Sequence, residues 1–374
     1  MTVRINKPAF NIREKLSELE RPIGLKGSEL MKAETAQEAR DLVSAGRKNM
    51  IINGAMQVAQ RSTSEATGTV PNANSTYYTC DRWHIFGIGS DNAQWTNSQS
   101  TDTPTGVGFG NSWKWDCTTA DASPAANARQ EITQIIESRN LQHLRYGTSN
   151  PEEITVSFWV KATKTGKNYC WMYQYDGADF IAHKYYINQS NTWEKKIITF
   201  KGNTAAAIAN DSTAGMGISW FLYAGSNYTT GTYQENKWRS WTSSDYNQFE
   251  DQTNHADSTS NDFYITEVQL EVGKNATEFE HRSYAEELAL CQRYYWQQEN
   301  FLWLYSLDSN HSYVRANIFH PVEMRAAPTV TGTFSNAGTA TGFQSVTRKH
   351  TIPYVNGPGS SLTDIQNGKF DAEY

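Results

Sequence analysis

Alternating hydrophobic and polar residues dominate the chain between residues 49 and 273. In the run EITVSFWVKA, the side chains of Ile154, Val156, Phe158 and Val160 fall on one face, because successive side chains of a strand point to opposite faces. Other strand-like runs are NMIINGAMQV, YYTCDRWHIFG, NSWKWDCTT, ARQEITQII, NYCWMYQYD, TWEKKIITF, MGISWFLYAG and DFYITEVQLEVG. One helical stretch, SRNLQHLR, interrupts them. Strands at this density predict a mainly β protein with a central antiparallel β-sandwich of the jelly-roll type.

A short helix follows the sandwich. Ser283 precedes Glu286 by three residues, the spacing of a capping box, and Leu288, Cys291 and Tyr295 fall on one helical face. After this helix the runs NFLWLYSLD, SYVRANIFHP, TVTGTFSN and GFQSVTRKH again have the pattern of strands. They predict a small C-terminal β-domain.

The first fifty residues have a different pattern. Of these residues 17 are charged, with a net charge of +3, whereas 19% of the whole chain is charged. Two short helices are expected, one capped by Asn11 and one beginning at Thr35. Their apolar stripes consist of Ile12, Leu16 and Leu19 in the first helix and of Ala39, Leu42 and Val43 in the second. Helices this short are not stable alone, so we expect this segment to dock on a partner.

Charge and hydropathy narrow the possible partners. The net charge of −6 and the pI of about 5.8 argue against nucleic acid, which needs a basic surface. No run of eighteen apolar residues is present, so no membrane insertion is expected. The N-terminus lacks the apolar core of a signal peptide, which predicts a soluble protein made in the cytoplasm.

No set of residues predicts catalysis, a metal or a cofactor. Nucleophile-elbow, phosphate-loop and zinc-helix motifs are missing, and the eight histidines are dispersed. The close carboxylates Asp176 and Asp179, like the group of Asp245, Glu250 and Asp251, lie in polar loops where solvated turn residues are the default. No compact Asp-rich loop specifies calcium. The four cysteines form no C-x-x-C pair and are expected to be buried free thiols.

Aromatic residues are the clearest binding candidates, since they make up 13% of the chain in a polar, charge-poor background. Trp113 and Trp115 are predicted to share one strand face, as are Trp171, Tyr173 and Tyr175. Rings can stack on the flat face of a sugar, or simply pack in a core or against a neighbouring subunit. The predicted ligand-binding residues are Trp238, Trp241, Tyr175, Asp176 and Arg239.

Several stretches resemble known proteins. KNMIINGAMQVAQRST followed by YYTCDRWHIF resembles the opening of a domain frequent in bacteriophage tail fibres and related virion proteins. ARQEITQIIESRNLQHLRYG with EITVSFWVKA resembles the core of carbohydrate-binding-module jelly rolls, and FYITEVQLEVGKNATEFEHRSYAEELALCQRYYW resembles the closing strand and exit helix in phage proteins. KAETAQEARDLVSAG and PVEMRAAPTV are similar to segments that flank such domains. The resemblance to the opening domain is carried by Asn49, Asn53, Gly54, Gln60, Arg61, Asp81, Arg82 and Trp83.

The resemblance implies a homotrimeric structural component of a phage tail, located in the virion. Residues 1–48 would attach it to other tail proteins through Ile12, Leu16, Leu19, Leu42 and Val43. Residues 49–281 would form the carbohydrate-binding-module-like sandwich, 282–298 the connecting helix and 299–374 the C-terminal β-domain. The β-domains would bind a host surface polysaccharide without cleaving it, an arrangement in which many weak contacts act together. A purely architectural virion protein and a polysaccharide depolymerase are the alternatives.

Overall fold

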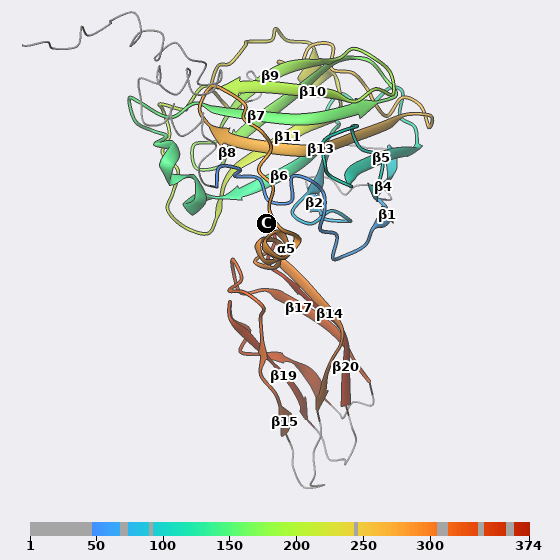
Figure 1. Cartoon of the computed structure of the whole chain (residues 1–374), viewed down its shortest axis with the longest axis vertical. Helices are drawn as coiled ribbons and strands as arrows, with labels where there is room; N and C mark the ends of the chain where they lie inside the picture. Colours follow the sequence, from blue (N-terminus) through green and yellow to red (C-terminus); the bar gives the residue numbers. More distant parts are fainter. Residues whose placement is uncertain are drawn as a thin grey trace, which may run out of the picture. The chain divides into compact units, whose positions relative to one another are not determined.

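A computed structural model describes residues 47–67, 74–89, 93–242, 246–304, 313–335, 340–356 and 363–374 (Figure 1). The part from Lys48 to Tyr374 forms one compact unit. The helices predicted before residue 47, together with the attachment residues Ile12, Leu16, Leu19, Leu42 and Val43, lie outside the described residues.

The described chain is mainly β, as predicted, and two antiparallel sheets form its sandwich. The first sheet contains, in order, β1 (Ser64–Ala66), β4 (Gln94–Ser100), β5 (Ser112–Thr119), β13 (Asp262–Val272), β7 (Ile154–Ala162) and β10 (Glu194–Phe200). The second contains β12 (Arg239–Ser240), β9 (Asp179–Ile187), β8 (Gly166–Gln174), β11 (Ala214–Ala224), β6 (Arg129–Glu137), β3 (His84–Ile88) and β2 (Asn74–Thr76). A four-residue helix, α4 (Ser226–Thr229), follows β11.

Large aromatic residues join the two sheets. Trp83 lies 6.1 Å from Trp113 of the first sheet and 5.8 Å from Trp220 of the second, measured between ring centroids. Phe158 packs against Trp220 at 5.3 Å. The predicted alternation in residues 154–160 is confirmed, since the four apolar side chains of that run are fully buried. Trp113 and Trp115 are also fully buried, so these two rings belong to the core.

The strand predicted over residues 49–58 is wrong. This segment contains only turns and irregular backbone, with φ of 58° at Asn53 and 55° at Met56. Both values lie in the left-handed region, which regular strand backbone does not adopt, and no strand pairing is present in this segment. The same holds at Arg82 (φ 71°), so the run YYTCDRWHIFG becomes a strand only from His84 onward. Long-range hydrogen bonds hold this backbone, and an alternating pattern does not reveal them.

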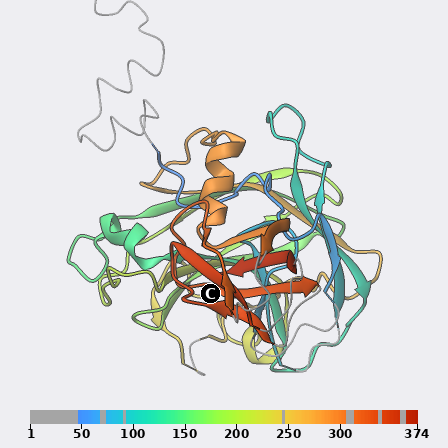
Figure 2. The ribbon, with the colours of Figure 1, turned by 90° about the horizontal axis from the view of Figure 1, so that it is seen from below.

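The two helices predicted after residue 47 are confirmed with one correction. SRNLQHLR forms the 3₁₀ helix η1 (Ser138–Leu144), and α5 (Tyr284–Gln292) begins with the expected capping box between Ser283 and Glu286. Figure 2 shows α5 beside the segment that begins at residue 48, and the backbone N–H of Asn53 donates to Glu287 of α5 at 2.6 Å. Tyr295 does not continue the helical face, because it already pairs with Asp371 as the first residue of a strand.

The C-terminal part contains two further small sheets. One has β14 (Tyr295–Leu304) and β17 (Thr329–Ser335) on either side of β20 (Thr363–Asp371). In the other, β15 (Tyr313–Arg315), β16 (Ile318–Phe319) and β18 (Ala340–Gln344) all pair with β19 (His350–Asn356). Strands therefore occur in each run predicted for this region.

Buried charges join the sandwich to the C-terminal strands. The guanidinium of Arg82 forms an ion pair with Glu373 and lies 3.4 Å from the centroid of the Tyr294 ring. Both charged side chains are at most 3% exposed. Arg61 forms a second ion pair, with Asp371 at 3.2 Å. Charges this deeply buried need partners in well-defined positions, so the junction has a specific geometry.

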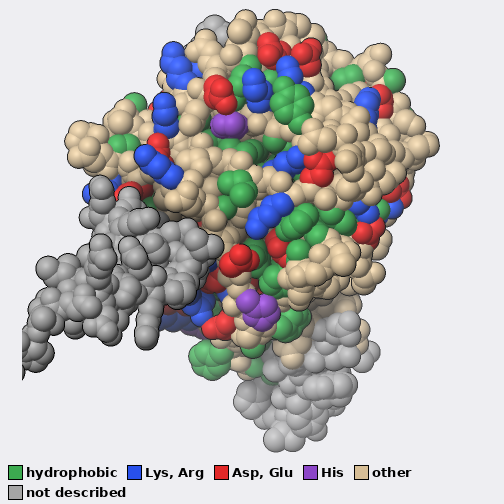
Figure 3. All heavy atoms as spheres, turned by 45° about the horizontal axis from the view of Figure 1, so that its top comes forward, with side chains coloured by type: hydrophobic (Ala, Val, Ile, Leu, Met, Phe, Trp, Pro, Cys, Tyr) green, Lys and Arg blue, Asp and Glu red, His purple; other side chains and the backbone are tan. Residues whose placement is uncertain are grey.

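The face drawn in Figure 3 and the four cysteine side chains agree with what the composition predicts. Figure 3 shows acidic and basic side chains scattered over a face of mostly uncharged groups, as the low charged fraction predicts. All four cysteines are free and buried, as predicted. Among the described residues, no helix has the length and apolar character needed to cross a membrane.

Glu267 gives a testable dependence of stability on pH. It occupies a bulge of β13 with φ of 48°, and burial raises the pKa of its carboxyl group from 4.5 to about 7. A group whose pKa is raised on folding stabilises the protein below its unfolded pKa, and that contribution is lost as pH rises through the folded pKa. Glu267→Gln is therefore expected to be more stable than the wild type by about 1–2 kcal/mol at pH 8, with a much smaller difference at pH 5. Urea unfolding at both pH values measures this, and an equal difference at both would contradict it.

Candidate functional site

The outer face of the second sheet lines a cavity of about 420 Å³. The period-two alternation of its strands places one set of side chains in the core and the other in this cavity. On β6, Ile132 and Ile136 are buried in the core, whereas Arg129, Glu131 and Thr133 line the cavity. The cavity lies within the size range of ligand pockets, roughly 300–1,000 Å³.

An aromatic wall forms one side of this cavity. It consists of Trp171 and Tyr173 from β8, of Tyr175 directly after β8, and of Trp241 directly after β12. The rings at 171, 173 and 175 all line this cavity, as predicted for side chains that share one face. The rings of Trp171 and Trp241 stack with centroids 5.1 Å apart and planes inclined by 22°. Tyr173 and Tyr175 continue the wall with their centroids 4.9 Å apart. Trp171 is only 5% exposed and is stacked by Trp241 and Phe221, so the more exposed rings of the wall are those of Tyr173, Tyr175 and Trp241.

The floor is formed by small side chains of β11 and β6. Gly217 and Ser219 lie on β11, and the hydroxyl of Ser219 is 2.8 Å from that of Thr133. A side chain at Gly217 would begin 3.4 Å from the Tyr175 hydroxyl, so the glycine keeps space open beside the wall. His84, Phe86 and Ile88 of β3 form the opposite side, where burial lowers the pKa of His84 to about 3 and keeps its ring neutral.

A buried ion pair lies at one end of the cavity. Arg129 Nε is 3.0 Å from Glu131 Oε1, and Trp171 Nε1 donates a hydrogen bond to Glu131 Oε2. The guanidinium also lies 4.7 Å from the Trp241 ring centroid, a cation–π distance. Burial raises the pKa of Glu131. Arg129 Nη1 has no hydrogen-bond partner in the described part of the chain. Arg129 is 5% exposed and Glu131 1% exposed, so this end of the cavity is closed by a nearly buried donor beside a nearly buried carboxylate acceptor.

The structure separates the five predicted ligand-binding residues. Tyr175 and Trp241 line the cavity, whereas Trp238, Asp176 and Arg239 are not among its lining residues. Trp238 Nε1 donates to Lys201 O at 2.7 Å, and its ring packs against Tyr146. Asp176 Oδ2 accepts from Ala209 N at 3.0 Å, and Arg239 belongs to β12, paired with Phe180 of β9.

Sequence reasoning did not select Arg129 and Glu131, although a signal was present. In ARQEITQII, Arg129, Glu131 and Thr133 occupy every second position, so a strand places these three polar side chains on one face. The same alternation on β11 places Ser219 between apolar neighbours. What the pattern could not show is that these faces lie side by side with β8.

The other acidic candidates serve as loop contacts. Asp179 Oδ2 accepts from Asn203 Nδ2 at 3.0 Å, away from Asp176, which binds a different backbone group. Glu250 and Asp251 both lie within 3.3 Å of Lys167 Nζ, while Asp245 is outside the described residues. Within the described ranges, no three His, Cys, Asp or Glu side chains are placed to hold a metal ion.

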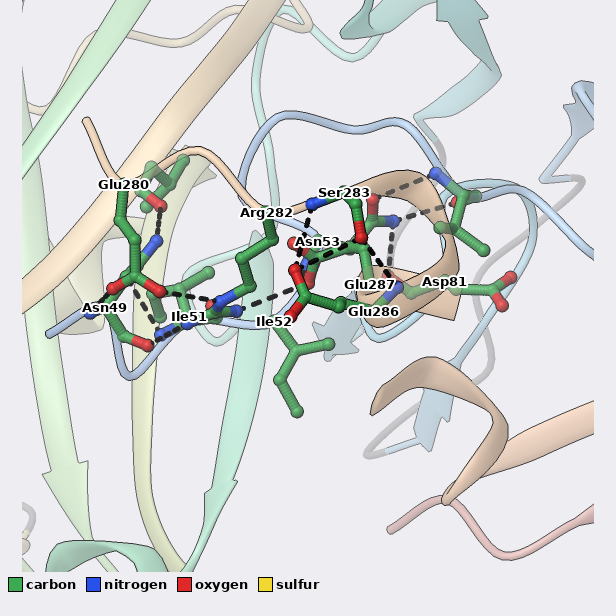
Figure 4. Close-up of polar contacts among 12 residues, drawn as sticks. Asn49, Ile51, Ile52, Asn53, Asp81, Glu280, Arg282, Ser283, Glu286 and Glu287 are labelled. Carbon is green, nitrogen blue, oxygen red and sulfur yellow. Dashed lines mark hydrogen bonds and ion pairs between the residues drawn. The ribbon is translucent and has the colours of Figure 1, made fainter. Parts of the chain in front are cut away.

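Three of the residues that carry the resemblance to phage proteins, Asn49, Asn53 and Asp81, belong to a hydrogen-bond network (Figure 4). Asn53 is its centre, since its side chain donates to Val58 O at 2.8 Å and to Asp81 O at 3.0 Å and accepts from Val58 N. Trp83 Nε1 donates to Asn53 O at 3.0 Å. These side chains fix the irregular segment after residue 48, and none of them lines the cavity.

A second part of this network ties the segment to the chain before α5. The Asn49 side chain accepts from the backbone N–H groups of Ile51 and Leu270, both at 3.0 Å. Arg282 donates to Ile51 O at 3.0 Å and to Glu280 at 3.0 Å, as Figure 4 shows. The network therefore closes the sandwich by joining its first and last segments, which is a structural role.

Comparisons with known proteins give weak matches. No family model matches the chain, and no curated protein matches its sequence. The enzymatically active domain of tailspike protein 4 from bacteriophage CBA120 is 14% identical over 60% of this chain, with a TM-score of 0.32, and this chain spans 21% of it. A putative sugar binding protein from Bacteroides thetaiotaomicron is 12% identical, with 60% and 100% of the two chains covered and a TM-score of 0.34.

A family 11 carbohydrate-binding module from a Clostridium thermocellum cellulase matches at 11% identity, covering 55% of this chain and 99% of that one, with a TM-score of 0.26. Similarity at this level does not decide what the cavity binds.

Proposed function

We propose that the cavity on the second sheet binds a carbohydrate. The observation that carries this proposal is the combination of the aromatic wall with the Arg129–Glu131 pair in one cavity. A sugar ring has flat C–H faces that stack on Trp241 and Tyr173, and hydroxyl groups that hydrogen-bond to the guanidinium and the carboxylate. The Arg129 guanidinium lies 4.7 Å from the centroid of the Trp241 ring, so both kinds of group occur side by side in this cavity.

Binding without cleavage is part of the proposal. Hydrolysis of a glycosidic bond ordinarily needs two carboxyl groups roughly 5–10 Å apart across the bond. Glu131 is the single Asp or Glu side chain among the described residues that line the cavity, and its carboxylate is engaged by Arg129 and by Trp171.

In its biological setting, we propose a structural component of a bacteriophage tail that presents this cavity to polysaccharide on the host surface. The sequence resemblance supports this setting. Residues 1–48 would attach the protein to the virion, and a homotrimer would present three copies of the cavity. Several weak sites on one particle bind far more tightly than one alone, because later contacts form at high effective concentration.

Trp241→Ala tests the cavity directly. Loss of one stacking ring is expected to weaken binding of extracted host surface polysaccharide about tenfold, or ~1.4 kcal/mol. Trp238→Ala is the matched control, since this second tryptophan of the same loop lies outside the cavity and should leave affinity unchanged. Titration calorimetry with the full chain measures both, and thermal unfolding checks that each variant folds.

The outcomes separate the alternatives. Equal affinity of the two tryptophan variants and the wild type would place sugar binding elsewhere. No binding to host cells or polysaccharide, with assembly onto tails intact, would leave an architectural protein. Release of oligosaccharides during the assay would identify a depolymerase instead.

A further inference from the structure

One residue of the cavity comes from outside the sandwich. Tyr374, which follows β20, lines the cavity together with strands of the second sheet. Its hydroxyl donates to Thr213 O at 3.3 Å. Thr213 directly precedes Ala214, the first residue of β11, and Ala214 pairs with Glu137, the last residue of β6. Tyr374 therefore lies at the edge of the sheet where β11 begins and β6 ends.

The strand register shows how the cavity is oriented. Trp171, Ser219, Thr133 and His84 are direct neighbours across β8, β11, β6 and β3. The aromatic wall on β8 and the side formed by β3 thus run parallel to the strands, with the small floor residues between them. Arg129 begins β6 and Tyr374 lies where β6 ends, so the charged pair and this tyrosine occupy opposite ends of the cavity.

Tyr374 is held firmly in this position. Arg325 donates from Nε to Ala372 O and from Nη2 to Glu373 O, both at 2.8 Å, and its guanidinium lies 4.0 Å from the Tyr374 ring centroid. Ala372 N donates to Tyr294 O at 2.7 Å. The buried Arg82–Glu373 ion pair fixes the preceding residue. The two residues before Tyr374 are therefore held by these contacts, and its own hydroxyl is held by Thr213 O, so its side chain has a defined position at this end of the cavity.

We propose that Tyr374 closes the cavity at this end, so that the site takes the terminal rings of a glycan chain and excludes the interior of a long chain. This inference rests on the proposed function, since it specifies which part of a carbohydrate is bound. A chain bound through its interior must leave the site at both ends. Here the Arg129–Glu131 pair occupies one end and Tyr374 the other. The volume of about 420 Å³ is near the lower end for ligand sites, which suits a few rings.

The number of protein molecules bound per glycan chain tests this inference. The probe is the host surface polysaccharide of the assay above, cut into linear fragments of graded length. The wild type is expected to bind one protein per fragment at every length, because each fragment has one end of the required kind. Tyr374→Ala is expected to bind several proteins per long fragment, with a number that rises with length. Tyr374→Phe keeps the ring and should behave like the wild type.

Each outcome of the stoichiometry experiment leads to one conclusion. A wild-type stoichiometry that rises with fragment length would overturn the inference, as would a Tyr374→Ala variant that still binds one protein per fragment. Tyr374→Leu provides a second shortened wall if the alanine variant unfolds. If the wild type binds no fragment, the proposed function itself fails and this inference fails with it. If the wild type binds the fragments but the number of proteins per fragment rises with fragment length, the proposed function stands and only the role of Tyr374 as an end wall is wrong.

Discussion

Gly54→Ala is expected to destabilise the protein by about 3 kcal/mol or more. A Cβ atom at this position would lie 2.1 Å from Val268 O, far inside any real contact distance. The clash involves backbone on both sides, because Val268 N donates to Gly54 O at 2.9 Å and neither the irregular segment around Gly54 nor β13 can move away without losing this bond. Overpacking against rigid backbone belongs to the small class of substitutions with large effects.

A second glycine, Gly110, is the control that separates the steric clash at Gly54 from the general effect of replacing glycine by alanine. Gly110 has open space around the position of a Cβ atom and no positive φ, so Gly110→Ala should change stability by less than about 0.5 kcal/mol. Denaturant unfolding of both variants gives the comparison. Similar stabilities for the two alanine variants would show that the segment after residue 48 is not held against β13 as described.

Arg82→Met is expected to cost about 3 kcal/mol, because it leaves the carboxylate of Glu373 buried without its main partner. Arg61 remains 3.8 Å from Glu373 and limits the loss. Methionine keeps much of the side-chain volume over the Tyr294 ring, so packing changes little. The loss of stability should be concentrated where the sandwich meets the C-terminal strands. Backbone hydrogen exchange of residues near Tyr294 should therefore speed up more than that of β7.

The double variant Arg82→Met with Glu373→Gln separates charge from packing. Removing both charges is expected to recover a substantial part of the stability, since an unpaired buried charge costs more than a missing pair. If the two single losses simply add in the double variant, the two side chains act independently and the ion pair does not hold the junction.

The sandwich was predictable because its information is local. Residues 154–160 alternate between apolar and mostly polar side chains, and the run that became β8 has aromatic rings at every second position. Each run forms the strand that its pattern predicted. The segment after residue 48 was not predictable, since its conformation depends on the Asn49 and Asn53 side chains binding backbone more than 200 and about 30 residues away. No periodic pattern encodes such contacts.

The cavity was predictable only in part, and the two loop tryptophans show why. Trp238 and Trp241 are three residues apart in the same polar stretch. Pairing of Arg239 with Phe180 turns one ring toward Tyr146 and the other onto Trp171. The sequence identified the loop as aromatic, and strand pairing determined which ring entered the cavity.

The position of β13 in the first sheet has a consequence during synthesis. This strand lies between β5 and β7, although it is made long after both. From Thr119 at the end of β5, a ribosome adding roughly 5–20 residues per second needs on the order of 10–30 s to reach Asp262. Until then, β5 and β7 each carry an open edge that no later strand has yet filled. The nascent chain must therefore remain soluble with half-built sheets, exposed to wrong pairing with its neighbours on the same polysome.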